Sequence, residues 1–259
     1  MTTSKMWSAG SFQINKDMQI LKADPDVALQ KNQDFDYSLV VFDLDGTLVD
    51  SASDISEAVN RMLQDWTLPR VEESIIRGWI GDGVRALVSS ALRYAGSSVE
   101  VDQVLAGFMV HYEDCLLLDP RVYAGVRETL QALQQREVPM AICTNKPERF
   151  VVPLLHALDL AAYFGCIVGG DTLPQRKPSP EPLLHVAAHY GLQPDQCLMV
   201  GDSSTDLLTA QAAGMPMAMV TYGYLRGFDP HSIPGVRVVD DMRELLHPPG
   251  PSPVGEGLG

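Results

Sequence analysis

Six short apolar runs alternate with helical patterns between residues 38 and 246, and this alternation constrains the fold more than any other feature. Runs of this length that are rich in Val, Ile, Leu and Met are typical of buried strands. They cover residues 38–45, 139–145, 166–170, 197–202, 216–222 and 236–239. Strands that alternate with helices form parallel sheets covered on both faces. The chain is therefore predicted to have an α/β fold with a Rossmann-like, doubly wound parallel sheet.

The connections between these strands differ greatly in length. Most have room for one helix, and the spacing predicts helices over 125–136, 147–158, 180–190 and 204–213. The first connection is roughly 95 residues long, whereas a strand-helix-strand crossover needs only about a dozen residues. Its apolar residues recur at helical spacing in three stretches, 55–66, 84–95 and 101–112, with a linker to the core at each end. Ser51 with Asp54 suggests a capping box at the start of the first stretch. We expect an inserted all-helical cap over 52–120 and an α/β core formed by 37–51 and 121–246.

The two ends of the chain lack such patterns. Residues 1–36 show no clear periodicity and are expected to form a poorly defined N-terminal extension, without the apolar segment of a secretory signal. Residues 247–259 are rich in Pro and Gly and are expected to be a flexible tail. Four cysteines without a C-x-x-C pair indicate free thiols in a reducing compartment. We therefore expect a cytoplasmic protein.

The charge of the chain excludes some classes of partner. It carries 33 acidic and 19 basic residues, a formal net charge of −14. Such a balance disfavours binding to nucleic acid or to anionic lipid, and the longest apolar runs are shorter than the roughly 18 residues of a membrane span. An anionic ligand would need a metal ion or a few local cations. Nothing in the sequence specifies an oligomeric state.

Three of the predicted strands end in polar residues. Because the carboxyl ends of parallel strands meet at one edge of a sheet, ligands bind there. The residues in question are Asp43 and Asp45, Thr144 and Asn145, and Asp202 followed by Asp206. Carboxylates brought together resist joint ionisation unless a cation offsets their repulsion. An all-oxygen site with few carboxylates suits Mg²⁺, while Asp206 is expected to cap a helix or to support the loop.

A lysine follows the third strand in the segment QRKPSPEP, residues 175–182. Pro178 and Pro180 restrict the backbone around Lys177 directly before a predicted helix. Lys177 is therefore a candidate for neutralising a carboxylate or a phosphate oxygen at this edge of the sheet.

Four segments, DLDGTLVDS, ICTNK, RKPSPEP and VGDSSTD, resemble in order and spacing the four motifs of the haloacid dehalogenase superfamily of phosphatases. The resemblance implies that Asp43 is the nucleophile that forms an aspartyl-phosphate and that Asp45 is the general acid and base. It further implies that Thr144 binds the phosphoryl oxygens and that Lys177 holds nucleophile and phosphate together. Mg²⁺ would be bound by Asp43, the backbone carbonyl of Asp45, and Asp202.

The resemblance also limits the substrate. An acid at Asp45 favours phosphate esters over carbon–halogen bonds, and GWIGDGVRALVSSAL is similar to a cap segment of phosphoglycolate phosphatases. A glycine-rich turn that opens a helix can offer backbone N–H groups to an anion. Gly81 and Arg85, together with Asn145 in the core, are therefore candidates for binding a small phosphorylated metabolite such as 2-phosphoglycolate.

Two other functions are compatible with parts of this pattern. A phosphosugar phosphatase, or a phosphosugar mutase similar to β-phosphoglucomutase, would use the same Asp43 and Asp45. A phosphate-sensing protein without catalytic activity would be expected to have lost Asp43, Asp45 or Lys177, and this chain keeps all three.

Overall fold

The computed structural model describes residues 35–247. Residues 1–34 and 248–259, which include nearly all of the expected extension and tail, lie outside the described part of the chain. Within residues 35–247, no helix is both long enough and apolar enough to cross a bilayer. Cys115, Cys143, Cys166 and Cys197 are free cysteines, as expected.

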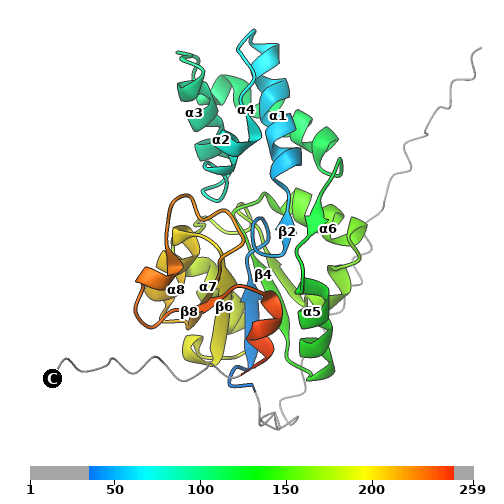
Figure 1. Ribbon diagram of the computed structural model, residues 1–259, viewed down its shortest axis with the longest axis vertical. Helices are drawn as coiled ribbons and strands as arrows, with labels where there is room; N and C mark the ends of the chain where they lie inside the picture. Colours follow the sequence, from blue (N-terminus) through cyan, green and yellow to red (C-terminus); the bar gives the residue numbers. More distant parts are fainter. Residues whose placement is uncertain (1–34, 248–259) are drawn as a thin grey trace, which may run out of the picture. The chain divides into compact units, whose positions relative to one another are not determined.

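A parallel sheet of six strands forms the centre of the fold (Figure 1). The strands are β1 (Leu39–Phe42), β4 (Met140–Cys143), β5 (Cys166–Val168), β6 (Cys197–Gly201), β7 (Met217–Val220) and β8 (Arg237–Val239). Their order is β5-β4-β1-β6-β7-β8, with all neighbours parallel. The α/β prediction is confirmed. Connections run outward in both directions from β1, so the strand order reverses beside it, which is where such sheets bind ligands.

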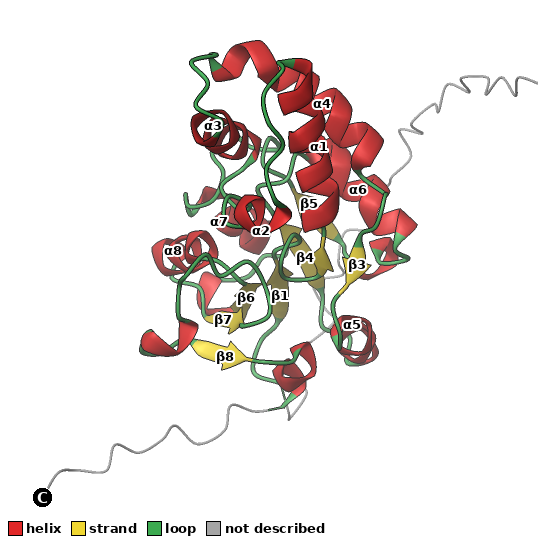
Figure 2. Ribbon diagram, turned by 45° about the horizontal axis from the view of Figure 1, so that its top comes forward, coloured by secondary structure: helices red, strands yellow, loops and turns green. Residues whose placement is uncertain are grey.

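Both faces of the sheet are apolar because successive side chains of a strand point to opposite sides. Val40 and Phe42 of β1 belong to one buried cluster, whereas Leu39 and Val41 belong to the other. Helices α5 (Val126–Gln135) and α6 (Glu148–Ala157) pack in the first cluster, and α7 (Glu181–His189) and α8 (Ser204–Ala213) in the second (Figure 2). All four helices lie where the sequence predicted them.

Short 3₁₀ helices complete the connections around the sheet. They are η1 (Ala161–Tyr163), η2 (Pro194–Gln196), η3 (Pro230–Ser232) and η4 (Met242–Leu246). None was predicted from the sequence, because one turn of helix is too short to show a period.

The long connection after β1 contains four helices, α1 (Ala52–Asp65), α2 (Glu73–Arg77), α3 (Val84–Tyr94) and α4 (Val101–Cys115). The sequence predicted all but α2, which is only five residues long. Where linkers were expected, β2 (Val49–Asp50) and β3 (Arg121–Val122) form an antiparallel ribbon. Figure 1 shows the four helices together beyond the carboxyl ends of the strands. Treating 52–120 as a separate cap domain stays a prediction.

The predicted capping box at the start of α1 is wrong. Ser51 occupies the N-cap position but makes no side-chain capping bond. Its hydroxyl donates instead to the carboxylate of Asp45 at 2.6 Å, while Asp54 accepts the backbone N–H of Asp119 at 2.9 Å. A hydrogen bond to a charged acceptor is stronger than one to a neutral acceptor. This bond turns the Ser51 side chain toward Asp45, and in this orientation its oxygen accepts no backbone N–H of the first turn of α1.

Candidate active site

The structure brings the polar ends of β1, β4 and β6 together. The backbone N–H of Asp43 donates to Val200 at 2.9 Å, which continues the pairing of β1 with β6 beyond the end of the strand. The chain then turns at Gly46, whose φ is +90°. A Cβ at this position would lie 2.1 Å from Oδ2 of Asp202. Only glycine fits here, because the turn after β1 passes directly over the Asp202 carboxylate.

Lys177 is buried between two carboxylates. Its Nζ lies 2.9 Å from Oδ1 of Asp43 and 2.6 Å from Oδ1 of Asp206, with 2% of the lysine side chain exposed. The other oxygen of Asp206 accepts the backbone N–H of Ser203 at 3.1 Å and its hydroxyl at 2.6 Å. Asp206 therefore closes a capping box at the start of α8 and also fixes Lys177, so both roles expected from the sequence are present.

Asp43, Asp202 and Asp206 form a buried acidic triad. One carboxylate oxygen from each residue lies within 4.8 Å of the corresponding oxygens of the other two. Burial raises the pKa of Asp43 to about 6 although Lys177 lowers it. Burial, and then the carboxylates of Asp206 and Asp43, hold the pKa of Asp202 well above its usual range. Three carboxylates facing one lysine leave negative charge uncompensated, and carboxylate oxygens are the donors that a hard divalent cation prefers.

The three carboxylates are not equally available to a metal ion. Both oxygens of Asp206 already have protein partners, namely Lys177 and Ser203. Each oxygen of Asp202 also accepts one hydrogen bond, from the Thr47 hydroxyl at 3.1 Å and from the backbone N–H of Tyr224 at 2.5 Å. Unlike Asp206, which pairs with Lys177, Asp202 has no ion pair with a described residue, so its charge is left for a metal ion. The donor set therefore fits a cation held by Asp43 and Asp202, with Asp206 in support. Sequence reasoning missed the contacts of Thr47 and Tyr224, because neither residue has a spacing that predicts them.

Asp45 has a different environment from Asp43. Its Oδ1 accepts the Ser51 hydroxyl at 2.6 Å and the Lys146 ammonium at 2.8 Å. Lys146 also donates to the hydroxyl of Tyr112, a residue of α4, and lies 4.8 Å from the centre of its ring. Burial alone would lower the pKa of Lys146, but Asp45 and Tyr112 together raise it above its usual range, so the ammonium is charged.

Lys146 and Tyr112 were not predicted as site residues. Lys146 lies within the segment ICTNK, in which a role was predicted for Thr144 and Asn145 but not for Lys146. Tyr112 has the helical spacing of a core residue. The position of Lys146 directly after two polar strand-end residues was the one available signal. No local pattern connects it to Tyr112, since the two residues lie 34 positions apart in the chain.

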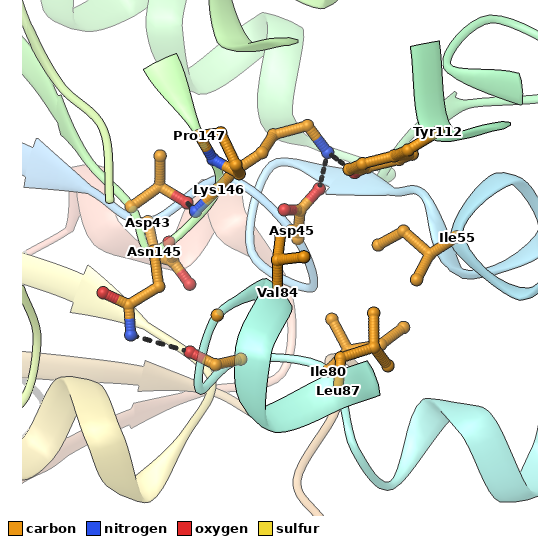
Figure 3. Close-up of a pocket in the computed structure, with 13 residues that line it drawn as sticks. Asp43, Asp45, Ile55, Ile80, Val84, Leu87, Tyr112, Asn145, Lys146 and Pro147 are labelled. Carbon is orange, nitrogen blue, oxygen red and sulfur yellow. Dashed lines mark hydrogen bonds and ion pairs between the residues drawn. The ribbon is translucent and has the colours of Figure 1, made fainter. Parts of the chain in front are cut away.

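A pocket opens beside these carboxylates and has two kinds of wall (Figure 3). It encloses about 430 Å³ of free space, part of it open to solvent. The polar wall is formed by Asp43, Asp45, Tyr112, Thr144, Asn145 and Lys146, and the apolar wall includes Ile55, Ile80, Val84 and Leu87. Of the described residues that line the pocket, Lys146 is the single basic side chain. The pocket wall thus combines two carboxylates of different environment with the ammonium of Lys146, while the second buried cation, Lys177, lies behind Asp43.

The glycine-rich turn between α2 and α3 is attached to the core. Asn145 donates to the carbonyl of Gly81 at 2.9 Å and to that of Lys177 at 3.0 Å. Asp82 accepts the Thr205 hydroxyl at 2.6 Å and pairs with Arg226 at 2.5 Å. Gly81 and Asn145 therefore both line the pocket as expected, but their hydrogen bonds join the turn before α3 to the core.

Arg85 does not line the pocket, contrary to the expectation from the sequence. Its guanidinium pairs with Asp102 of α4, and the two side chains are 53% and 74% exposed. Val84 lines the pocket at the preceding position. Because consecutive helical residues differ by about 100° in direction, Arg85 projects from a different side of α3 than Val84 and pairs with α4.

Comparison with known proteins agrees with this geometry. Residues 40–220 match the family model of haloacid dehalogenase-like hydrolases. The chain is 47% identical over 215 residues to phosphoglycolate phosphatase 1 of Pseudomonas aeruginosa, covering 80% of this chain and 78% of that protein. It is 45% identical over 213 residues to a phosphoglycolate phosphatase of Pseudomonas putida, with the same coverage of 80% and 78%.

Solved structures support the same assignment. A crystal structure of a predicted phosphoglycolate phosphatase from Haemophilus somnus superposes with a TM-score of 0.77 at 34% identity, covering 82% of this chain and 97% of that one. The sheet order, the strand-end carboxylates with their buried lysine, and these similarities lead to one conclusion. The chain belongs to the haloacid dehalogenase-like hydrolases.

Proposed function

We propose that this chain is a magnesium-dependent phosphoric monoester hydrolase whose principal substrate is 2-phosphoglycolate. The observation that carries the proposal is the pair of carboxylates at the end of β1, of which Asp43 contacts Lys177 and Asp45 contacts Lys146. Relatives that are 42% to 47% identical and named phosphoglycolate phosphatase support the choice of substrate.

In this proposal Asp43 attacks phosphorus and forms an aspartyl-phosphate while the P–O bond to glycolate breaks. The Lys177 ammonium, 2.9 Å from the attacking carboxylate, offsets the repulsion between that carboxylate and the anionic phosphoryl group. The Thr144 hydroxyl lies in the wall of the same pocket and is the donor for a phosphoryl oxygen.

Asp45 transfers protons in both halves of the reaction. It donates a proton to the departing glycolate oxygen and then accepts one from the water that hydrolyses the aspartyl-phosphate. Ser51 and Lys146 both donate hydrogen bonds to Oδ1 of Asp45. Oδ2 of Asp45 accepts no hydrogen bond from the described residues. One oxygen is thus held in place while the other is free to carry the proton.

Asp43, Asp202 and the backbone carbonyl of Asp45 would hold Mg²⁺. When bound there, the ion supplies positive charge that offsets the phosphoryl oxygens and the carboxylates around them. The raised pKa values of Asp43 and Asp202 support this assignment, because a cation is what would stabilise both residues in the charged form.

A screen for phosphate release tests the proposal. The purified chain is assayed with Mg²⁺ on a panel of small phosphorylated metabolites, and 2-phosphoglycolate is expected to give the highest kcat/KM. Asp43→Asn is expected to lose at least about 10⁴-fold in kcat, since the nucleophile is removed. Full activity of Asp43→Asn, release of phosphate without a divalent cation, or return of the phosphoryl group to a sugar would each contradict the proposal.

A further inference from the structure

We infer that Lys146 and Tyr112 form a second anion site, which binds a carboxylate on the leaving group of the substrate. The inference rests on the proposed phosphatase function and specifies its substrate class. That class is the phosphate monoesters of small hydroxy acids, in which an acidic group lies one carbon away from the ester oxygen.

Lys146 is the residue of the pocket wall that can bind a substrate carboxylate through its charge. An unpaired carboxylate in a largely apolar pocket is costly, so an anionic leaving group requires a cation or strong donors. Lys146 is the single basic side chain among the described residues of the pocket wall, and 1% of it is exposed. Arg85 and Arg226 pair with Asp102 and Asp82 respectively, and neither lines the pocket.

The hydrogen bonds of the pair leave donors unused. An ammonium group has three N–H donors, of which Asp45 and the Tyr112 hydroxyl receive two. Tyr112 accepts the bond from Lys146, and its own O–H finds no acceptor among the described residues. One N–H of Lys146 and the O–H of Tyr112 therefore remain for the two oxygens of a carboxylate. Figure 3 shows Lys146 between Asp45 and Tyr112 at the wall of the pocket.

The position of Lys146 agrees with the covalent structure of such a substrate. Asp45 must approach the leaving oxygen to about 2.7 Å in order to protonate it, and Lys146 lies 2.8 Å from the same carboxylate. In a phosphorylated 2-hydroxy acid, one carbon separates the leaving oxygen from the carboxyl carbon, a distance of about 2.4 Å from ordinary bond lengths. Lys146 contacts Oδ1 of Asp45 while Oδ2 meets the leaving oxygen, so the two contacts lie on neighbouring atoms of one carboxylate. A substrate carboxylate bonded one carbon from the leaving oxygen is therefore within hydrogen-bond reach of the Lys146 ammonium.

The opposite wall disfavours larger polar leaving groups. Ile55, Ile80, Val84 and Leu87 offer the substrate no side-chain hydrogen bonds. Sugar hydroxyls placed against this wall would lose their bonds to water without replacement, which costs free energy for each group. The pocket thus selects for a short leaving group with one acidic end.

The test compares two substrates that differ in the carboxylate. The full chain with Mg²⁺ is assayed on 2-phosphoglycolate and on ethyl phosphate, and the ratio of their kcat/KM values is measured. Lys146→Met is expected to lower this ratio by about 10- to 100-fold, mainly through KM, because a charge-assisted hydrogen bond is lost. Tyr112→Phe keeps the ring and is expected to lower the ratio by about 3- to 10-fold.

Arg149→Met is the matched control, since it removes a positive charge three residues later at an exposed position. Its ratio should equal that of the unmodified chain. Equal losses on both substrates in Lys146→Met would mean that Lys146 acts through Asp45 alone, and this would overturn the inference. If Lys146→Met does not fold, Tyr112→Phe decides the question, because an unchanged ratio in that variant also overturns it.

The same assay separates this inference from the proposed function. If the unmodified chain hydrolyses neither ester, the proposed phosphatase activity fails. If it hydrolyses ethyl phosphate as efficiently as 2-phosphoglycolate, the phosphatase activity stands and the second anion site is refuted.

Discussion

At the scale of single residues, Asp43 and Asp45 show how one strand end presents two carboxylates with different properties. Asp43 is buried beside Lys177 and Asp206, and burial raises its pKa to about 6. Asp45 contacts Ser51 and Lys146, and its side chain is 11% exposed. A nucleophile needs a fixed, unprotonated oxygen, whereas a proton donor needs an oxygen that can gain and lose a proton. The Lys177 ammonium opposes the effect of burial by lowering the pKa of Asp43, and it holds one oxygen of that carboxylate. Both hydrogen bonds to Asp45 are on Oδ1, which leaves Oδ2 for the proton.

Replacing Asp45 should affect substrates according to their leaving groups. Asp45→Asn keeps the shape but removes the titratable oxygen, so kcat on 2-phosphoglycolate should fall by about 10²- to 10⁴-fold. Formation of the aspartyl-phosphate from p-nitrophenyl phosphate should fall much less, because nitrophenolate leaves without a proton. A rapid-quench measurement of phosphoenzyme formation with both esters tests this. Asp195→Asn, at an exposed position, is the control, and equal losses with both esters would contradict the role of Asp45 as acid.

At the scale of elements, the turn after β1 determines how the metal-binding carboxylate is presented. Gly46 has a φ of +90°, and a Cβ at this position would lie 2.1 Å from Oδ2 of Asp202. The backbone N–H of Tyr224 and the Thr47 hydroxyl hold the same carboxylate. This arrangement requires glycine at position 46 for two separate reasons, the positive φ and the missing Cβ.

Gly46→Ala separates these two reasons when it is compared with Gly191→Ala. Gly191 also has a positive φ, +67°, but a Cβ there would contact nothing within 4 Å. Both variants should lose about 1 kcal/mol of unfolding free energy from backbone strain. Only Gly46→Ala should raise the Kd for Mg²⁺, by at least about tenfold, because the new Cβ displaces the Asp202 carboxylate. Calorimetric titration with Mg²⁺ measures the difference, and equal affinities would contradict the assigned ligand.

Much of the architecture could be predicted from the sequence, because the spacing of apolar residues indicates both the type of an element and the face that it buries. The six strands, four core helices and three of the helices after β1 follow this rule. The five-residue α2 and the two-residue strands β2 and β3 are too short to show a period. The strand-end residues Asp43, Thr144, Lys177 and Asp202 were predictable because a parallel sheet brings strand ends together.

Contacts between distant segments were not predictable. Lys146 meets Asp45 across 101 positions of the chain, and no local pattern encodes such a pairing. Ser51 was assigned to a capping box because the sequence cannot show that its side chain turns toward Asp45. Arg85 was assigned to the substrate because its direction on α3 depends on how α3 packs against α4, which spacing alone does not determine.

At the scale of the whole molecule, the fold concentrates buried negative charge that only a cation can offset. For Asp43 the pKa rises from 3.8 to about 6 on folding, so the native state binds the proton more tightly than the unfolded chain. Without a metal ion, the free energy of unfolding therefore falls as the pH rises from about 4 to about 6, because Asp43 must lose its proton in the folded chain. The free energy of unfolding stays lowered at higher pH. Mg²⁺ binding to the ionised carboxylates should reverse the loss.

The increase in Tm that Mg²⁺ causes should therefore be larger at pH 7.5 than at pH 5. Comparing the chain with and without Mg²⁺ at each pH removes the effect of all other titrating groups. Asp202→Asn should show a smaller increase at pH 7.5, because one metal ligand is lost. Differential scanning calorimetry gives the values, and a Mg²⁺-dependent increase that is the same at both pH values would contradict the assignment of Asp43 and Asp202 as ligands.

Hydrolysis of an unactivated phosphate monoester requires a rate acceleration that approaches ~10²¹-fold. Removing one oriented donor typically costs only about 3 to 4 kcal/mol of transition-state stabilisation, so nucleophile, proton donor, lysine and metal site must act on one phosphoryl group together. The proposed reaction depends on Asp43 being the nucleophile, whose carboxylate oxygen forms the first new bond to phosphorus. Trapping that bond tests it most directly.

The chain is mixed with 2-phosphoglycolate and Mg²⁺, quenched in acid within the first turnover, reduced with borohydride and digested for mass spectrometry. Borohydride converts an aspartyl-phosphate to homoserine. Homoserine is therefore expected at position 43 alone, and none is expected in Asp43→Asn. Modification of a different residue, or turnover of 2-phosphoglycolate by Asp43→Asn with no trapped intermediate, would contradict the account.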